Sequence, residues 1–117
     1  MPEFQSFDGT RLYWEEAGSG IPVIFVHEFG GDYRSWHRQV EALSKRFRCV
    51  TYSARGFLPS VVPSLRNQYG QMQSTGDLLA LMDHLELEHA HLVGTSMGSF
   101  TSLDFALKHE DRVTMGT

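Results

Sequence analysis

The pattern of hydrophobic and polar positions begins with two short stretches of strand character. Residues 4–7 and 11–15 flank the pair Asp8-Gly9, and an Asp-Gly pair readily adopts the positive φ that a tight hairpin needs. After a glycine-rich break, residues 22–26 read Pro-Val-Ile-Phe-Val, an unbroken apolar run typical of a strand covered on both faces. The pattern therefore predicts an N-terminal hairpin followed by a central parallel strand.

Helical spacing follows the central strand. Four apolar residues recur with charged residues between them, namely Trp36, Val40, Leu43 and Phe47. This spacing predicts an amphipathic helix packed on a sheet, and residues 49–52 predict the next strand. Residues 53–70 contain prolines and glycines without a clear period, which predicts a long irregular connection of the kind that often borders a binding site.

The same strand and helix pattern is repeated in the last third of the chain. The next buried helical stripe consists of Leu78, Leu81, Met82 and Leu85. Residues 90–93 are then strand-like and residues 97–108 helix-like. Strands that alternate with helices imply right-handed crossovers, so the predicted fold class is α/β, with a mostly parallel sheet, an N-terminal antiparallel hairpin and helices on both faces. No internal repeat or linker divides residues 1–117.

Composition and charge narrow the classes of function. The 117 residues are 41% hydrophobic and 21% charged, as in a soluble globular domain, and the formal charge of −4 is spread over mixed acidic and basic positions. Nucleic acid is therefore not an expected partner. No apolar run approaches the roughly 18 residues of a membrane span, and no signal peptide is recognisable. Cys49 is the only cysteine, which fits a reducing cytoplasm.

The clearest chemical motif lies where a predicted strand meets a predicted helix. Residues 94–98 read Gly-Thr-Ser-Met-Gly and fit the pattern Gly-x-Ser-x-Gly. A nucleophilic serine on a tight turn needs neighbours without side chains two positions before and after it, and Gly94 and Gly98 meet that need. Ser96 is the predicted nucleophile and the Met97 N–H a predicted oxyanion donor. The alternative is a structural turn in which Ser96 caps the helix.

A second candidate segment follows the strand 22–26. It reads His27-Glu28-Phe29-Gly30-Gly31-Asp32, and it lies where a second backbone oxyanion donor would have to be. The Phe29 N–H is the candidate donor, with His27 and Gly30 supporting the loop. The alternative is an ordinary glycine-rich connection in which His27 merely forms hydrogen bonds.

These two segments and the Arg55-Gly56 turn together resemble the α/β-hydrolase superfamily, especially single-domain hydrolases of the lactonase, esterase and C–C-bond hydrolase type. The resemblance implies Ser96 as nucleophile, backbone donors at Met97 and Phe29, and no cofactor or metal. A serine rather than an aspartate argues against the haloalkane dehalogenase and epoxide hydrolase branches, which use a carboxylate nucleophile. Glu28 replaces the glycine of the usual His-Gly pair, and Arg34 and Arg55 are the candidate partners for its charge.

The acid and histidine of a catalytic triad are not found where the resemblance requires them. In this superfamily they follow the nucleophile in the chain, yet only 21 residues follow Ser96. The acidic and histidine side chains in that stretch read as a solvated helix end: Asp104, His109, Glu110 and Asp111. His109 would lie about 20 Å along the helix axis from Ser96. The partial domain 1–117 is therefore expected to be truncated, with acid and histidine located beyond Thr117.

Two hypotheses of function remain open at this point. The first is a parent serine hydrolase that attacks an ester, lactone or related carbonyl of a small molecule, with this chain inactive alone. The second is a non-catalytic fragment or interaction module that keeps the half-fold. An unpaired strand edge at residues 90–93 would favour self-association in either case. Four residues could line a pocket or belong to the core, and they do not identify a substrate: Tyr33, Trp36, Phe57 and Leu58.

Overall fold

The computed structural model describes residues 2–116, whose strands form one sheet in the order β1-β2-β4-β3-β5-β6. The strands are β1 (Glu3–Gln5), β2 (Arg11–Ala17), β3 (Ile21–Val26), β4 (Phe47–Tyr52), β5 (Ala90–Gly94) and β6 (Val113–Gly116). β1 with β2 and β2 with β4 are antiparallel, and the other neighbours are parallel. The predicted hairpin and mostly parallel sheet are confirmed.

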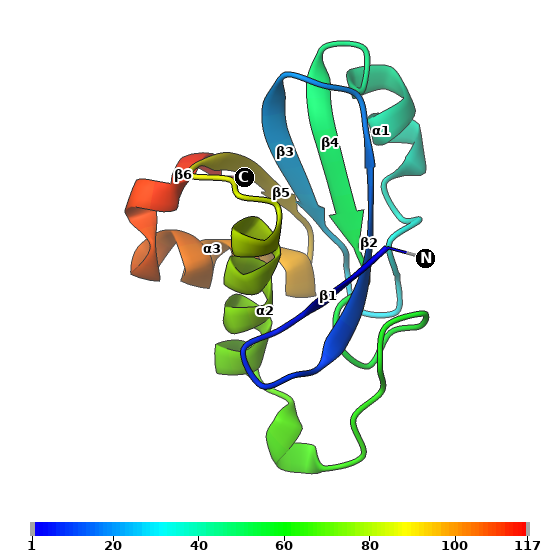
Figure 1. Ribbon diagram of the computed structural model, residues 1–117, viewed down its shortest axis with the longest axis vertical. Helices are drawn as coiled ribbons and strands as arrows, with labels where there is room; N and C mark the ends of the chain where they lie inside the picture. Colours follow the sequence, from blue (N-terminus) through cyan, green and yellow to red (C-terminus); the bar gives the residue numbers. More distant parts are fainter. Residues whose placement is uncertain (1, 117) are drawn as a thin grey trace.

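Helices cover both faces of this sheet, as predicted. α1 (His37–Leu43) lies on one face, and α2 (Gln71–His84) and α3 (Met97–Lys108) pack side by side on the other (Figure 1). Two short 3₁₀ turns, η1 (Arg66–Gln68) and η2 (Glu110–Arg112), interrupt the connections. The segment between β4 and α2 is otherwise irregular, in agreement with the sequence pattern.

β3 is covered on both faces, as its apolar run predicts. Ile24 and Val26 contribute to the core beneath α2 and α3, whereas Val23 and Phe25 pack on the opposite face with Trp36 at the start of α1. The side chains of these four β3 residues are buried. Successive residues of a strand point to opposite faces, so a strand between two layers of helices must be apolar at every position.

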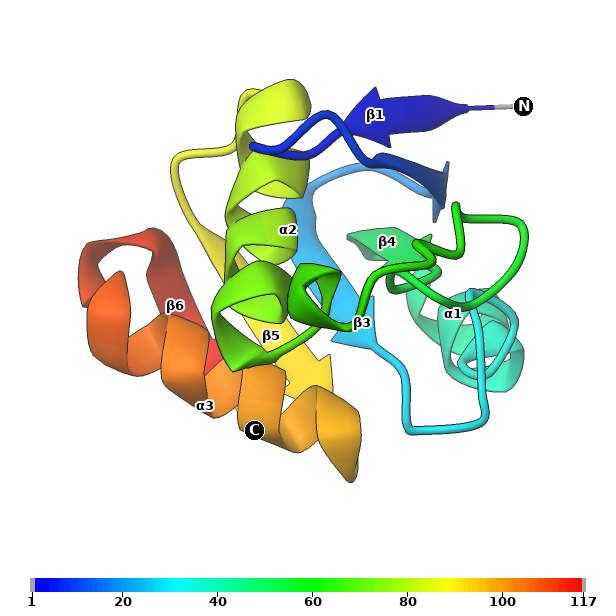
Figure 2. The same ribbon diagram turned by 90° about the horizontal axis from the view of Figure 1, so that it is seen from below.

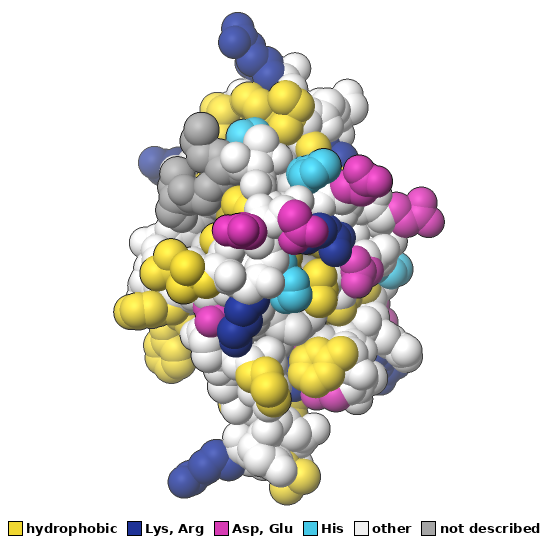
Figure 3. All heavy atoms as spheres, turned by 90° about the vertical axis from the view of Figure 1, so that its left-hand side faces the viewer, with side chains coloured by type: hydrophobic (Ala, Val, Ile, Leu, Met, Phe, Trp, Pro, Cys, Tyr) yellow, Lys and Arg dark blue, Asp and Glu magenta, His cyan; other side chains and the backbone are white. Residues whose placement is uncertain are grey.

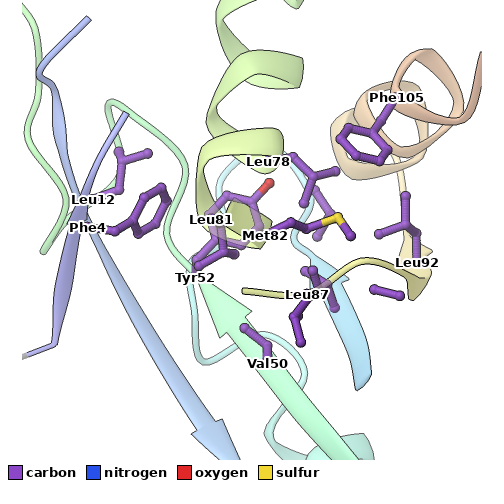
Figure 4. Packing of buried hydrophobic residues seen from close by; sticks show 13 residues of the cluster. Phe4, Leu12, Val50, Tyr52, Leu78, Leu81, Met82, Leu87, Leu92 and Phe105 are labelled. Carbon is purple, nitrogen blue, oxygen red and sulfur yellow. The ribbon is translucent and has the colours of Figure 1, made fainter. Parts of the chain in front are cut away.

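The main core lies between the sheet and the pair α2 and α3. Leu78, Leu81 and Met82 of α2 are fully buried against side chains of β3, β4 and β5, and Phe105 of α3 closes the same cluster (Figure 4). The predicted stripe of α2 is therefore the face that contacts the sheet. Leu85, its last member, lies at the C-cap of the helix and packs against the edge of the cluster.

One helix boundary of the sequence prediction is wrong, and one strand is missing from it. Phe47 does not continue the first helical stripe; it opens β4 opposite Ile21, because α1 ends at Leu43 and the polar residues 44–46 reverse the chain. Residues 113–116 form β6, which was not predicted because four residues are too few to show a period.

β6 also corrects the expectation of an unpaired edge at residues 90–93. It pairs in parallel with β5, starting with Ala90 opposite Val113, so the outer strand of the described sheet is β6. Arg112 fixes the approach to β6 through hydrogen bonds to the carbonyl oxygens of Leu87 (2.6 Å) and Glu88 (2.7 Å). Self-association through an apolar β5 edge therefore loses its structural basis.

The surface shows no segregation of charge on the face toward α3 and β6. Acidic, basic and histidine side chains are interspersed there with small hydrophobic groups (Figure 3). Within residues 2–116, no helix is long and apolar enough to cross a membrane. The same residues contain no group of three His, Cys, Asp or Glu side chains arranged to hold a metal ion.

Candidate active site

Ser96 occupies a strained turn between β5 and α3. Its backbone has φ 55° and ψ −121°, and Glu86 is the other non-glycine residue with positive φ among those described. Such a conformation costs about 1–3 kcal/mol, so it persists only where the surrounding structure enforces it. Ser96 is exposed and makes no side-chain capping hydrogen bond to α3, which argues against the alternative of a capping serine.

The glycines on either side of Ser96 are required by close backbone contacts. A Cβ at Gly94 would lie 2.4 Å from the carbonyl oxygen of Gly98, and a Cβ at Gly98 would lie 2.0 Å from that of Val26. Real Cβ atoms essentially never approach so closely. Gly98 therefore lets the first turn of α3 pack against the end of β3.

The carboxyl ends of β3 and β5 bring the two predicted site segments together. Val26 is paired with Gly94, and the ends of both strands lie side by side when the molecule is seen from this edge (Figure 2). The loop that begins at His27 and the turn that carries Ser96 therefore start from neighbouring points. The structure thus juxtaposes the segments that the sequence analysis singled out.

His27 is buried and uses both ring nitrogens within the protein. Its Nε2 accepts a hydrogen bond from the Ala54 N–H at 2.9 Å, so the proton resides on Nδ1, which donates to the Glu28 carbonyl oxygen at 2.8 Å. Burial lowers the pKa of His27 and favours this neutral form. Neither nitrogen is free to take a proton from Ser96, and His27 instead ties the end of β3 to the end of β4.

Glu28 points into its own loop. Its Oε1 accepts a hydrogen bond from the Ser35 hydroxyl at 2.7 Å, and a Cβ at Gly31 would overlap the same oxygen. The expected pairing with Arg34 or Arg55 is wrong. Arg34 binds Asp32, two residues before it, at 2.7 Å, because that carboxylate is within reach of both its backbone and its guanidinium.

Arg55 is the centre of a buried ion cluster that sequence reasoning missed. Its guanidinium binds Asp77 of α2 (2.6 and 2.8 Å), Asp8 of the hairpin (2.9 and 3.2 Å) and the Gln68 carbonyl oxygen (2.7 Å). Ser6 donates a further hydrogen bond to Asp77. Arg55 lowers the pKa of Asp8 to about 2. The available signal was Asp77, a charged residue within the apolar stripe of α2.

Phe29 and Met97, the two predicted donor residues, line one hollow of about 430 Å³. Phe29 is 76% exposed, and its ring meets the Phe57 ring edge-on with the centroids 5.8 Å apart. Phe57 also contacts His27, with ring centroids 5.0 Å apart. A larger hollow of about 930 Å³ lies between β1 and α2, and none of the predicted site residues lines it.

The acidic residues and histidine that follow Ser96 lie away from it. His109 is the C-cap of α3, at the opposite end of the helix from Ser96, and Glu110 and Asp111 belong to η2. Asp104 accepts a hydrogen bond from the Thr75 hydroxyl of α2 and pairs with Lys108 at 3.1 Å. Among the described residues, the structure does not bring these groups to the proposed nucleophile.

Comparison with protein families gives a match over most of the chain. A family model described as the alpha/beta hydrolase fold matches residues 21–117. The chain is 34% identical to an epoxide hydrolase of Caballeronia sordidicola over 106 residues, which are 90% of this chain and 32% of that protein. The chain spans about a third of the length of the curated relatives that it matches.

Solved structures show the same partial coverage. An epoxide hydrolase of Vigna radiata superimposes with a TM-score of 0.94 at 27% identity, over 98% of this chain and 37% of the other. The enol-lactonase of Burkholderia xenovorans LB400 superimposes with a TM-score of 0.91 at 34% identity, over 98% of this chain and 45% of the other.

Proposed function

Because this chain belongs to the α/β-hydrolase fold family, we propose that it is the nucleophile-bearing part of a serine hydrolase. The substrate of the longer protein is a small molecule with an ester, lactone or related carbonyl, and the reaction proceeds through an acyl-enzyme. Ser96 is the nucleophile, and the N–H groups of Met97 and Phe29 bind the oxyanion. Gly94, Gly98, His27 and Gly30 support these groups.

The backbone conformation of Ser96 is the observation that carries this proposal. Ser96 combines φ 55° with ψ −121° and does not cap α3 with its side chain, and this combination indicates a strained turn held for function. The turn presents the hydroxyl at the N-terminus of α3, where the Met97 N–H has no partner within the helix and the helix dipole favours negative charge. Both features stabilise a tetrahedral oxyanion.

The serine favours a carbonyl substrate over an epoxide. When a serine oxygen attacks a carbonyl carbon, it forms an ester, the alcohol leaves with the proton taken from Ser96, and water then hydrolyses the ester. Attack of the same oxygen on an epoxide carbon would give an ether, and water does not hydrolyse an ether as it hydrolyses an ester. The epoxide hydrolases among the relatives therefore share the scaffold, while Ser96 favours the reaction class of the lactonase.

Neither of the two histidines considered as a base for Ser96 is placed to act as one in the described part of the chain. His27 has both nitrogens engaged, and His109 lies at the far end of α3. An acid and a histidine supplied from outside residues 1–117 would complete the triad, so the 117-residue chain is expected to be inactive by itself.

Acylation in the presence of an external base tests the proposal. The chain is incubated with p-nitrophenyl acetate and a high concentration of imidazole, and the acyl adduct is located by peptide mass spectrometry. Imidazole replaces the missing base, so an adduct on Ser96 is expected, absent in Ser96→Ala and retained in the matched control Ser99→Ala. An absence of adduct on Ser96, or equal labelling of Ser96 and Ser99, would contradict the proposal.

A further inference from the structure

The hollow of about 430 Å³ beside the proposed oxyanion donors is bounded mainly by apolar side chains. Phe29 and Met97, which carry the proposed donors, line one part of the hollow. Phe57 and Tyr69 form its walls, and Ser74 lines it from the first turn of α2. Its volume lies within the ~300–1,000 Å³ typical of small-molecule sites. A carbonyl bound by the N–H groups of Phe29 and Met97 would therefore have a substituent next to this hollow.

Tyr69 is held as a wall of the hollow. Its hydroxyl donates a hydrogen bond to the Pro63 carbonyl oxygen at 2.6 Å, and its ring lies over Gly56, where a Cβ would come within 2.9 Å of Cε1. Gly56 has φ +88°, so the turn that admits the ring needs glycine. The ring is thus fixed from both sides, and the hollow has a defined wall.

Arg55 is the one cation among the described residues that line the hollow, and it offers no hydrogen bond to a ligand. Each of its five N–H donors is already used by Asp77, Asp8 or the Gln68 carbonyl oxygen. The two carboxylates also neutralise its charge. An anionic group in the hollow would lose its hydration without gaining a charged partner.

Resting on the proposed function, we infer that this hollow is the subsite for an uncharged, apolar substituent of the scissile carbonyl. The substituent is aliphatic or aromatic, and it contacts the rings of Phe57 and Tyr69 and the thioether of Met97. Substrates whose corresponding group carries a carboxylate are selected against, because all five N–H donors of the Arg55 guanidinium are already used.

Binding of two amides that differ at one end tests the inference, and no chemical reaction is needed. Hexanamide and adipamate share the amide end, but adipamate has a carboxylate in place of the terminal methyl. Amide chemical shifts of the ¹⁵N-labelled chain are recorded during titration with each. Hexanamide is expected to shift the signals of Phe29, Gly56, Tyr69 and Met97 with millimolar affinity, and adipamate to bind at least about tenfold more weakly.

Substitutions at Ser74 give the matched control. Ser74→Leu fills the hollow from an α2 position and is expected to abolish these shifts, whereas Ser74→Ala leaves the hollow open and keeps them. The inference is overturned if hexanamide shifts other residues instead, if adipamate binds equally well, or if Ser74→Leu binds like the unmodified chain. The titration measures binding without a reaction at Ser96, so a failed acylation and a failed subsite are separate results.

Discussion

Gly98 illustrates how one residue couples the nucleophile turn to the sheet. A Cβ at this position would meet the Val26 carbonyl oxygen at 2.0 Å, and backbone atoms of a central strand cannot move away cheaply. We expect Gly98→Ala to lower the free energy of unfolding by about 3 kcal/mol, measured by urea denaturation.

The control for Gly98→Ala is Gly76→Ala, which also adds a methyl group to a helical glycine. The nearest atoms there belong to the ring of Phe7, whose side chain is 59% exposed and can move. Gly76→Ala is expected to be neutral or to stabilise α2 by up to about 1 kcal/mol. Equal destabilisation by both substitutions would show that the backbone contact of Gly98 is unimportant.

His27 makes the stability of the protein sensitive to mild acid. Burial lowers its pKa in the folded state below the ordinary value of 6.5, whereas the unfolded chain takes up a proton near that value. The contribution of neutral His27 is therefore complete above pH 6.5 and is lost as the pH falls below it. The free energy of unfolding should decrease between pH 7 and pH 5, and the decrease should be smaller in His27→Gln. An identical pH profile for both proteins would argue against a buried neutral imidazole.

At the scale of elements, the Arg55 cluster links the hairpin to α2. Asp8 has a folded pKa of about 2 against an ordinary value of 3.8, so its contribution to stability is present above pH 4 and is lost as the pH falls toward 2. Asp8→Asn should therefore lower the free energy of unfolding at pH 7 by about 1 kcal/mol, after allowance for its partial exposure. The difference between the two proteins should shrink as the pH falls from 4 to 2.5.

A surface ion pair supplies the control for Asp8→Asn. Glu16 binds Arg48 at 2.9 Å between β2 and β4, with both side chains partly exposed. Glu16→Gln is expected to change the free energy of unfolding by less than about 0.5 kcal/mol. If Glu16→Gln costs as much as Asp8→Asn, the buried cluster has no special role.

The elements that could be predicted from the sequence are those with a sustained period. The apolar run of β3 and the buried stripe of α2 indicate which side chains face the core, and the motif around Ser96 combines fixed spacing with a strand before it and a helix after it. β6 was missed because four residues carry no period, and its place depends on Arg112 binding carbonyl oxygens far away in the chain. The Arg55 cluster joins residues 47 and 22 positions apart, so no local pattern reveals it.

At the scale of the whole molecule, the described residues pack into two apolar clusters, one on each face of the sheet. β1 to β6 form one sheet, α2 and α3 cover the larger cluster and α1 the smaller one, and Ser96 lies in its strained turn between β5 and α3. The groups that would activate Ser96 are not among its neighbours. We propose that the turn at Ser96 is preformed but has no base beside it, and one experiment tests this combination.

That experiment is labelling of the folded chain with a fluorophosphonate probe and no added base, alongside Ser96→Ala. Circular dichroism first establishes that both proteins are folded. We expect no labelling of either protein, because both nitrogens of His27 are engaged and His109 lies at the far end of α3 from Ser96. Labelling that is present in the unmodified chain and absent in Ser96→Ala would mean that residues 1–117 assemble a working base, and would contradict the account.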